Sequence, residues 1–363
     1  MKVFPQIEPL LGSEEREEVL TVLNSGFITE GKKTREFETE VARFLGAQYA
    51  IAVNNATVGL AIALMALGIG PTDEVLVPDF TFIATANAVA LIGATPVFVD
   101  VDPRTFVIDL EDACRRVTKQ SRAIVPVHLN GRSPDMGSLE SFAAEHGLRI
   151  VEDAAQALGS RHAGRYLGTL GDAGVYSFGT TKIITTGQGG IIVTQSTKIY
   201  EACVRLKDHG RPSRSSEVHE TFGFNSKFTD LQAALGLAQL RKLPNRIEQK
   251  RKLYQWYRDE LASLPGIEFP PIDLSETVPW FVDILCADRA ALELHLKSAG
   301  IGTRRFYLPQ HSQPCFMSSG SYPNTESISR AGLWLPSSAR LTGDDVGIIC
   351  TSIRNFGLEY ISR

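Results

Sequence analysis

One lysine in this 363-residue sequence has unusual neighbours for a charged side chain. Lys182 lies in TTKIITTGQGG, and no other charged residue occurs between Asp172 and Lys198. Any single lysine is most often a solvated surface group. A lysine that is buried among apolar and β-branched neighbours instead has a lowered pKa, and its amine can form a Schiff base with a carbonyl group. Lys182 is therefore the first candidate for a covalent role.

Two acidic residues, Glu152 and Asp153, end an apolar run that begins at Arg149 and predicts a strand. Successive side chains of a strand point to opposite faces, so the two carboxylates are not expected to share a metal ion or to act as a glycosidase-like pair. We expect one of them to face a ligand alone, and Asp153 is the candidate. The alternative is that Asp153 caps a helix that begins at Ala154.

A strand-to-helix junction at residues 54–57 offers a place for an anion. The strand predicted over residues 49–53 leads there into NNATVGLAIALMAL, where a buried apolar helix begins. Backbone N–H groups at a helix N-terminus and the helix dipole favour a phosphate, and Thr57 adds a hydroxyl group. The alternative is an ordinary helix cap by Asn55 or Thr57, which needs no ligand.

The elements that must position these residues alternate in type along the chain. The periodicity predicts helices over residues 14–23 (with Ser13 as the N-cap), 33–45, 84–94 and 136–146. It predicts strands over residues 74–82, 96–102, 122–131, 149–151, 174–178 and 191–195. This order predicts an α/β fold with a mixed, mostly parallel sheet flanked by helices. Functional loops of such a sheet cluster beyond the carboxyl ends of its strands.

The composition is that of an ordinary globular protein, with 43% hydrophobic and 21% charged residues. A net charge of −4 gives no electrostatic basis for binding nucleic acid or an anionic membrane. No run reaches the ~18 apolar residues of a membrane span, and the N-terminus lacks a signal peptide's apolar core. The five cysteines form no CxxC pair and suit neither a disulfide framework nor a zinc site. We therefore expect a soluble protein of the reducing cytoplasm.

The character of the chain changes near residue 245. The stretch 246–264 predicts a charged amphipathic helix, and a proline-rich segment follows it. The length of the chain also exceeds what one hydrophobic core usually serves. We therefore expect a large domain over residues 1–245 and a small C-terminal α+β domain over residues 246–363.

Four segments of the chain occur in a defined order: TFIATANA, VEDAAQALGS, YSF followed by the lysine of TKIITTGQGG, and FNSKFTDLQAALGLAQL. Together they resemble the nucleotide-sugar aminotransferases of the DegT/DnrJ/EryC1/StrS family. The resemblance extends from about Gly12 to Phe356, which is nearly the whole chain. It implies a fold-type I enzyme that depends on pyridoxal 5′-phosphate (PLP), with a large PLP-binding domain.

The resemblance implies roles for four residues around the ring of PLP. Lys182 would hold the cofactor covalently and, once displaced by an incoming amine, would carry a proton between Cα of the amino acid and C4′ of the cofactor. Asp153 would pair with the pyridine nitrogen and keep it protonated. Gln156 would bond the phenolic oxygen. Phe82 would stack on the ring, although an aromatic residue beside an apolar run is more often part of the core.

The resemblance also implies a phosphate site made by Thr57, Ser177 and the backbone of Ala56. In the family, an asparagine of the loop before the alanine-rich helix reaches the cofactor phosphate of the partner subunit. Asn225 occupies that place in FNSKFTD, so the resemblance implies a homodimer with shared active sites. The alternative is an ordinary loop in which Asp230 lies near a helix cap.

The segment IGTRRFYLPQHSQPCF resembles the family's substrate-facing loop. Its basic pair Arg304 and Arg305, together with Tyr307 and His311, would contact a diphosphate, a sugar or the carboxylate of the amino donor. Each of these residues taken alone is more often a surface group. His311 is not expected to bind a metal, because no second His or Cys lies at ligand spacing, and we expect no metal site.

The sequence departs from the family's usual pattern at several positions. Ala56 stands where a glycine is common, Gln188 where a glutamate is frequent, and Lys227 where an arginine is frequent. The segments TTGQGG and KFTD resemble a branch near the perosamine synthases. These changes affect the expected substrate more than the expected chemistry.

We therefore expect a PLP-dependent aminotransferase that moves an amino group from an amino acid, with glutamate as the expected donor, to a nucleotide-linked 4-keto-6-deoxy sugar. A PLP-dependent sugar dehydratase is one alternative, but the dehydratase branch has histidine in place of Lys182. A non-catalytic sugar-sensing protein of the same fold is another alternative. An NAD-dependent enzyme is disfavoured, since no GxGxxG follows a predicted strand.

Overall fold

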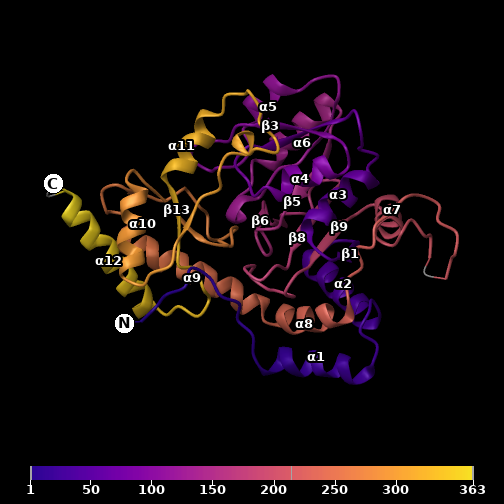
Figure 1. The fold of residues 1–363 in the computed structure, drawn as a ribbon, viewed down its shortest axis with the longest axis horizontal. Coiled ribbons are helices and arrows are strands. Elements are labelled where there is room, and N and C mark those ends of the chain that lie inside the picture. The colour runs from indigo at the N-terminus through magenta and orange to yellow at the C-terminus, as the bar shows by residue number, and fades with distance from the viewer. Residues whose placement is uncertain (1, 214, 362–363) are drawn as a thin grey trace.

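Two β-sheets organise the chain in the computed structural model, which describes residues 2–213 and 215–361. A large sheet is formed within residues 49–194 and a small sheet within residues 267–335. The long helix α9 (Leu243–Leu261) runs from the large-sheet part to the small-sheet part (Figure 1). The domain boundary expected near residue 245 falls in the first turn of α9 and remains a prediction.

Seven strands form the large sheet in the order β1-β9-β8-β5-β4-β2-β3. They are β1 (Tyr49–Val53), β2 (Glu74–Pro78), β3 (Thr95–Val99), β4 (Ser121–Ile124), β5 (Arg149–Asp153), β8 (Ala173–Ser177) and β9 (Gly190–Thr194). β9 is antiparallel to its neighbours β1 and β8, and the other adjacent pairs are parallel, so six strands run the same way. The predicted α/β fold with a mixed, mostly parallel sheet is confirmed.

Alternate residues of each strand face opposite layers of helices. In β1, Ile51 and Val53 pack in one core, whereas Ala50 and Ala52 pack in another. The first core is covered by α3 (Ala56–Ala66), α4 (Ala84–Leu91) and α7 (Thr197–Lys207). The opposite face is covered by α2 (Lys32–Leu45), α5 (Leu110–Arg116), α6 (Met136–His146) and α8 (Asp230–Arg241). Because helices bury both faces, the strands are nearly continuous apolar runs.

Local signals set several of the helix ends. The helix predicted over residues 136–146 is α6, and Gly147 ends it in the left-handed conformation with a φ of 65°. The expectation that Ser13 caps the first helix is wrong, because α1 (Ser13–Ser25) has Gly12 as its N-cap. The Gly12 N–H donates to the Glu15 carboxylate at 2.7 Å, and this bond makes Gly12 the capping position.

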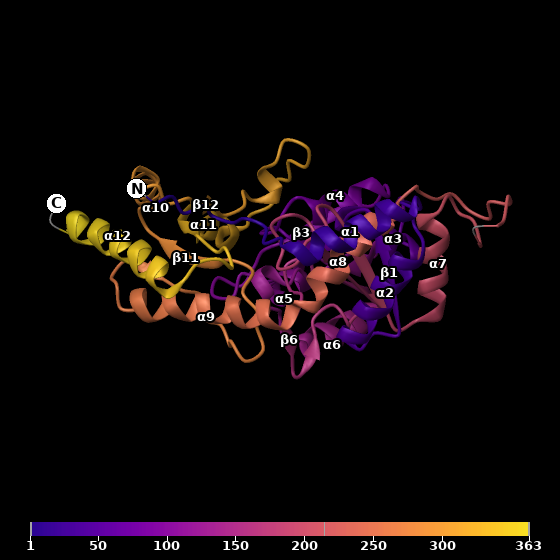
Figure 2. The same ribbon diagram turned by 90° about the horizontal axis from the view of Figure 1, so that it is seen from below.

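The small sheet is antiparallel and has the order β10-β11-β13-β12. Its strands are β10 (Ile267–Glu268), β11 (Val282–Cys286), β12 (Arg304–Arg305) and β13 (Gly332–Leu335). Helices α9, α10 (Arg289–Ser298) and α12 (Gly343–Ile361) pack around its core and form one end of the molecule (Figure 2). Phe4, near the start of the chain, is buried in this same core and its backbone pairs with Ile301.

Shorter elements lie between those already described. Helix α11 (Pro323–Ala331) precedes β13, and a small hairpin is made by β6 (Arg161–His162) and β7 (Arg165–Tyr166). Within residues 2–213 and 215–361, no helix combines the length and the apolar character that crossing a membrane requires.

Candidate active site

The carboxyl ends of the six parallel strands lie at one edge of the large sheet, and ligands of open α/β sheets bind at such edges. Most of the predicted site residues stand at these strand ends or just after them. They are Ala56 and Thr57 after β1, Phe82 after β2, Asp153 and Gln156 at the end of β5, and Ser177 and Lys182 at the end of β8. The topology therefore gathers residues that are far apart in the sequence.

Lys182 lies on the loop after β8 and is half-buried. Its Nζ lies 3.7 Å from the ring centroid of Trp280, which belongs to the segment before β11. Burial lowers the pKa of Lys182 to about 7, while the carboxylate of Asp153 opposes this shift and the guanidinium of Arg304 adds to it. The amine therefore exists in both protonation states near neutral pH, as a group that accepts and returns protons must.

Asp153 is the last residue of β5 and is buried. Thr85 Oγ1 donates to Asp153 Oδ2 at 2.7 Å, and the Ala155 N–H donates to Oδ1 at 3.1 Å. Burial raises the pKa of Asp153 above its usual value, although these donors and Lys182 favour its charged form. Residues 154–160 form turns, so the alternative in which Asp153 caps a helix is wrong.

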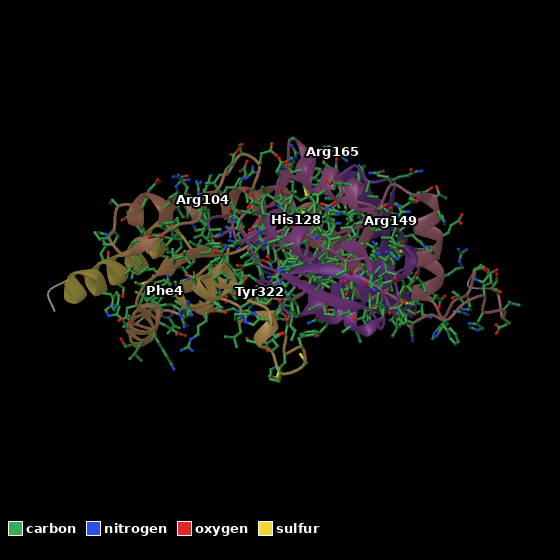
Figure 3. The ribbon with its side chains drawn as sticks, turned by 90° about the horizontal axis from the view of Figure 1, so that it is seen from above. Phe4, Arg104, His128, Arg149, Arg165 and Tyr322 are labelled. Atoms are coloured by element: carbon green, nitrogen blue, oxygen red, sulfur yellow. The ribbon has the colours of Figure 1, made fainter. Side chains whose placement is uncertain are left out.

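The neighbouring Glu152 has a different set of partners. Its carboxylate contacts His128 Nε2 at 2.7 Å and accepts the N–H groups of Gly168 and Gly171 at 2.6 Å each. His128 is labelled in the middle of the molecule in Figure 3. Burial disfavours the charged form of Glu152, but His128 and these donors hold its pKa below the usual value. Glu152 and Asp153 are therefore not a joint carboxylate site, as strand alternation predicts.

Gln156 is buried, and its oxygen accepts the Asn130 N–H at 2.9 Å. The amide nitrogen is then the end of Gln156 that can donate to a ligand, which suits a phenolic oxygen. Asn130 has a left-handed backbone with a φ of 53°. Its side chain donates to the Phe281 carbonyl at 2.7 Å and accepts the Phe281 N–H at 2.5 Å. Gln156 is thus linked through Asn130 to the segment that carries Trp280.

Gly190, the first residue of β9, joins the two parts of the predicted phosphate site. It pairs with Val53 of β1 on one side and with Ser177 of β8 on the other. A Cβ atom at Gly190 would lie 2.7 Å from the backbone nitrogen of Ala56, a distance that real Cβ contacts do not reach. Glycine is therefore required where β9 meets the N-terminus of α3, and this close approach brings Ser177 toward that helix end.

The N-terminus of α3 is capped by Asn55, whose Oδ1 accepts the Val58 N–H at 2.9 Å. The helix cap offered as the alternative to an anion site is therefore present and is made by Asn55, and a phosphate at this helix end remains a prediction. Thr57 lies in the first turn of the helix and is half-buried. A cap satisfies part of the N–H groups at a helix start, so the first turn can still bind an anion.

Phe82 lies beyond β2 with 49% of its surface exposed, so the alternative that it is a core residue is wrong. Its ring centroid lies 5.7 Å from that of Tyr307. Tyr307 is buried, and its pKa is raised by burial, with the charge of Asp153 adding to the shift. Phe82 and Tyr307 thus form an aromatic border of the site on the side of Asp153.

The basic pair of β12 divides between the two sides of the strand. The Arg304 guanidinium lies 5.6 Å from the ring centroid of Tyr307, and its charge lowers the pKa of Lys182. Arg305 is exposed and donates to Glu293 of α10 at 2.7 Å. Arg304 therefore faces the site, and the expectation that Arg305 also does so is wrong because successive strand residues point opposite ways.

His311 is held in place by contacts with Asp79 and Tyr322. Its Nδ1 contacts Asp79 Oδ2 at 2.7 Å, and its backbone N–H donates to Asp79 Oδ1 at 2.7 Å. Its ring stacks on Tyr322, with 4.6 Å between the centroids, and Figure 3 labels Tyr322. These contacts fix the loop after β12 on the end of β2, and contact of His311 with a substrate remains a prediction.

Asn225 is exposed and lies on the segment between α7 and α8. The backbone of Asn225 pairs with Asp208, and Lys227 pairs with Val53 at the end of β1. The segment therefore passes the same edge of the large sheet as the other site residues. The following helix α8 is capped by Thr229, and contact of Asn225 with a partner subunit remains a prediction.

Sequence reasoning missed three residues that this geometry brings to the site: Thr85, Asn130 and Trp280. A signal for Thr85 was present, because it lies in TFIATANA beside Phe82. Asn130 is recognisable only from its left-handed backbone. Trp280 follows a proline-rich stretch, and nothing near it in the sequence indicates an approach to Lys182.

These groups together suit one cofactor. A lysine amine that titrates near neutral pH matches an aldehyde, and a buried carboxylate beside it matches a pyridine nitrogen. The amide of Gln156 matches a phenolic oxygen. The N-terminus of α3, which Gly190 approaches closely, matches a phosphate. The residues present therefore fit PLP, and the fold and site define a PLP-dependent enzyme of fold type I.

The sequence matches the DegT/DnrJ/EryC1/StrS aminotransferase family over residues 9–354, and the chain belongs to this family. It is 37% identical to the GDP-perosamine synthase of Escherichia coli O157:H7 over 361 residues, which cover 98% of this chain and 99% of that protein. The predicted family and the aminotransferase class are confirmed.

Solved structures agree with this assignment. The aminotransferase TlmJ from Streptoalloteichus hindustanus is 32% identical and superposes with a TM-score of 0.94. The superposition covers 99% of this chain and 100% of that chain. The PLP form of the putative sugar aminotransferase Spr1654 from Streptococcus pneumoniae is 25% identical and superposes with a TM-score of 0.93. The superposition covers 99% of each chain. The predicted dependence on PLP is confirmed.

Proposed function

We propose that this enzyme transfers an amino group from an amino acid, with glutamate as the donor, to a nucleotide-linked 4-keto-6-deoxy sugar. Membership of the family supports amino transfer, and similarity to a GDP-perosamine synthase supports a nucleotide-linked sugar. The observation that carries the proposal is the amine of Lys182, with a pKa of about 7, at the carboxyl edge of the sheet. A dehydratase of this fold would have histidine at that position.

Lys182 performs the proton transfers in this scheme. PLP supplies the aldehyde that binds amines and the ring that accepts electrons when a proton leaves the amino acid. When its amine is not bonded to the cofactor, Lys182 Nζ would take the proton from Cα of the amino acid and later return it. A pKa of about 7 permits both steps. The same amine performs the transfers in reverse order when the keto sugar is the substrate.

Other residues orient and charge the cofactor. The carboxylate of Asp153, held by Thr85, would keep the pyridine nitrogen of PLP protonated. The amide nitrogen of Gln156 would donate to the phenolic oxygen. The first turn of α3, which includes Thr57, would bind the phosphate together with Ser177, which pairs with Gly190.

Arg304 is the cation that we assign to substrate binding. Its guanidinium lies beside Tyr307 and acts electrostatically on Lys182, so it lies close to the reacting amine. An arginine binds carboxylates and phosphates through paired N–H groups. Arg304 therefore binds either the carboxylate of the amino donor or the diphosphate of the sugar nucleotide.

A homodimer in the cytoplasm completes the proposal. Asn225 has an exposed side chain at the edge of the large sheet, where it is available to reach the cofactor phosphate of a partner subunit. The five cysteines are all unpaired, which suits a reducing compartment.

A panel of GDP-linked and other nucleotide-linked 4-keto-6-deoxy sugars, each incubated with glutamate and the PLP-loaded enzyme, tests the proposed function. We expect mass spectrometry to detect an amino sugar, with one 2-oxoglutarate formed for each amino group transferred. Lys182→Ala is the matched control and should form neither product. Loss of a sugar hydroxyl without amination would favour the dehydratase, and binding without turnover would favour a sensing protein.

A further inference from the structure

Trp280 is the side chain that lies on the amine of Lys182. It is 5% exposed, and its ring centroid lies 3.7 Å from Lys182 Nζ. At this distance the amine contacts the π-face of the indole. Trp280 belongs to the segment between β10 and β11 of the small sheet, whereas Lys182 follows a strand of the large sheet. The contact is therefore made between the two halves of the chain.

Trp280 is held in this position by one hydrogen bond from its indole and another to its backbone carbonyl. Its Nε1–H donates to the carbonyl of Thr181, the residue before Lys182, at 2.7 Å. The backbone carbonyl of Trp280 accepts from Lys250 Nζ of α9 at 2.7 Å. Its ring also stacks on Phe281, with 3.8 Å between the centroids. Contacts of this kind preorganise the indole against the amine.

The residue after Trp280 is fixed as well. Asn130 bonds both backbone groups of Phe281, and its own N–H donates to Gln156. The segment 280–281 thus reaches two parts of the site. Trp280 contacts the Lys182 amine directly, and Phe281 is linked through Asn130 to the Gln156 amide. A displacement of this segment would move both.

The indole face distinguishes between the two protonation states of the amine. It attracts an ammonium ion and gives no comparable stabilisation to a neutral amine. Burial and the charge of Arg304 act in the opposite direction on Lys182, whereas the carboxylate of Asp153 favours the ammonium ion together with the indole. A proton taken from a substrate must remain on Nζ until it is returned, so an ammonium ion at this place requires a group that stabilises it.

We propose that Trp280 is a catalytic residue whose indole face holds the Lys182 amine while that amine is not bonded to the cofactor and stabilises the ammonium ion that carries the transferred proton. In this step an N–H bond forms on Nζ as the substrate C–H bond breaks and leaves its electron pair behind. The same proton leaves Nζ when the new C–H bond forms. The inference rests on the proposed amino transfer, and Asn130 and Lys250 act as positioning residues for Trp280.

The pH dependence of Lys182 reactivity tests this role. The enzyme is loaded with pyridoxamine 5′-phosphate, which leaves Lys182 unbonded, and acylation of Lys182 by acetic anhydride is followed by peptide mass spectrometry. We expect Trp280→Leu to lower the midpoint by about one pH unit, a tenfold change in the protonation equilibrium. Trp256→Leu, at a half-exposed tryptophan of α9, is the matched control and keeps the wild-type midpoint.

Two further measurements make the outcome decisive. Trp280→Phe keeps a smaller ring face and should lower the midpoint by less than Trp280→Leu does. In Trp280→Leu, kcat should fall about tenfold with little change in the KM of the sugar. An unchanged midpoint in Trp280→Leu, or in Trp280→Phe where the leucine variant fails to fold, overturns the proposal. The midpoint needs no sugar, so a shifted midpoint without amination of any sugar supports the contact and rejects the proposed function.

Discussion

The adjacent carboxyl groups of Glu152 and Asp153 differ in how their charge is compensated. Both side chains are buried. Glu152 contacts His128 and accepts three backbone N–H groups, and its pKa is lowered in spite of burial. Asp153 accepts one hydroxyl and one backbone N–H, and burial raises its pKa. A protonated ring nitrogen beside Asp153 would supply the compensation that Glu152 already has.

Replacement of Asp153 by asparagine keeps the shape of the side chain and removes its charge. We expect kcat to fall by at least about 10²-fold, because a pyridine nitrogen that loses its proton makes the ring a poorer electron acceptor. Steady-state kinetics with glutamate and the accepted keto sugar measure the change. Asp172→Asn is the matched control and should retain wild-type turnover, because Asp172 lies just before the first residue of β8, at the edge of the sheet opposite to the site. Near wild-type rates in Asp153→Asn would reject the role given to this residue.

Sequence reasoning reached Lys182 and Asp153 because their immediate neighbours are unusual. Lys182 is isolated among uncharged residues, and Asp153 ends an apolar run. Trp280 and Asn130 could not be found in this way, since their importance lies in contacts with residues far away in the sequence. The same limit applies to Arg305, whose outward direction depends on the register of a two-residue strand.

At the scale of elements, the contact between β9 and α3 depends on Gly190. In Gly190→Ala, the added methyl group would meet the backbone of Ala56 and push the strand away from the helix end. We expect the affinity for PLP to fall by roughly tenfold, since overpacking of this kind displaces the backbone. Absorbance titration of the PLP-free protein measures the affinity. Gly70→Ala is the control, because a Cβ there meets nothing within 4 Å, and an unchanged affinity in Gly190→Ala would contradict the proposed phosphate site.

Helix α9 carries a second buried lysine. Lys250 Nζ donates to the carbonyls of Trp280 and Ser337, and burial lowers its pKa from the usual 10.5 to about 7. Between these two values the unfolded chain binds one more proton than the folded chain does. The contribution of Lys250 to the free energy of unfolding therefore rises as the pH rises from 7 to 10.5 and is constant below 7.

We expect Lys250→Met to remove this pH dependence. Its free energy of unfolding should rise less steeply than that of the wild type by about 1.4 kcal/mol per pH unit between pH 7.5 and pH 10. Urea unfolding at a series of pH values measures the slope. Lys252→Met, at an exposed position of the same helix, should leave it unchanged. Parallel slopes for the wild type and Lys250→Met would show that Lys250 does not titrate in this range.

Element boundaries could be predicted where the signals are local. The strand β1 and the helix α6 were expected with the bounds that the structure has, because an apolar run and a helix-ending glycine define them. The cap of α1 could not be predicted. Glu15 is held by Gln239 and Lys242, and these contacts with the end of α8 place its carboxylate on the Gly12 N–H.

At the scale of the whole molecule, the site depends on how the two sheets are held together. Arg132 and Asp283 form a buried ion pair at 2.7 Å between the loop after β4 and strand β11. Ser160 Oγ accepts the Val278 N–H at 2.9 Å in the same junction. These contacts anchor the chain on either side of Trp280, so the position of the indole on Lys182 follows from the packing of one sheet against the other. The α/β order was predictable from periodicity, but this junction was not.

Mixing of two impaired variants tests whether the active sites are shared between subunits. Lys182→Ala lacks the amine, and Asn225→Ala lacks the amide that we assign to the phosphate of the partner's cofactor. We expect each variant alone to have little activity. Sedimentation of the wild type should show a dimer, and a fully active monomer would reject the shared site.

In a mixed dimer the two defects fall in the same site if Asn225 acts across the interface. The other site then combines an intact Lys182 with an intact Asn225 from the partner. Random exchange of subunits should therefore restore about a quarter of the wild-type activity, because half of the dimers are mixed and each has one intact site. Lys182→Ala mixed with Asp153→Asn is the matched control. Both of these residues belong to one subunit's site, so every site in that mixture is defective and no activity returns. Recovery in neither mixture would place Asn225 in the site of its own chain.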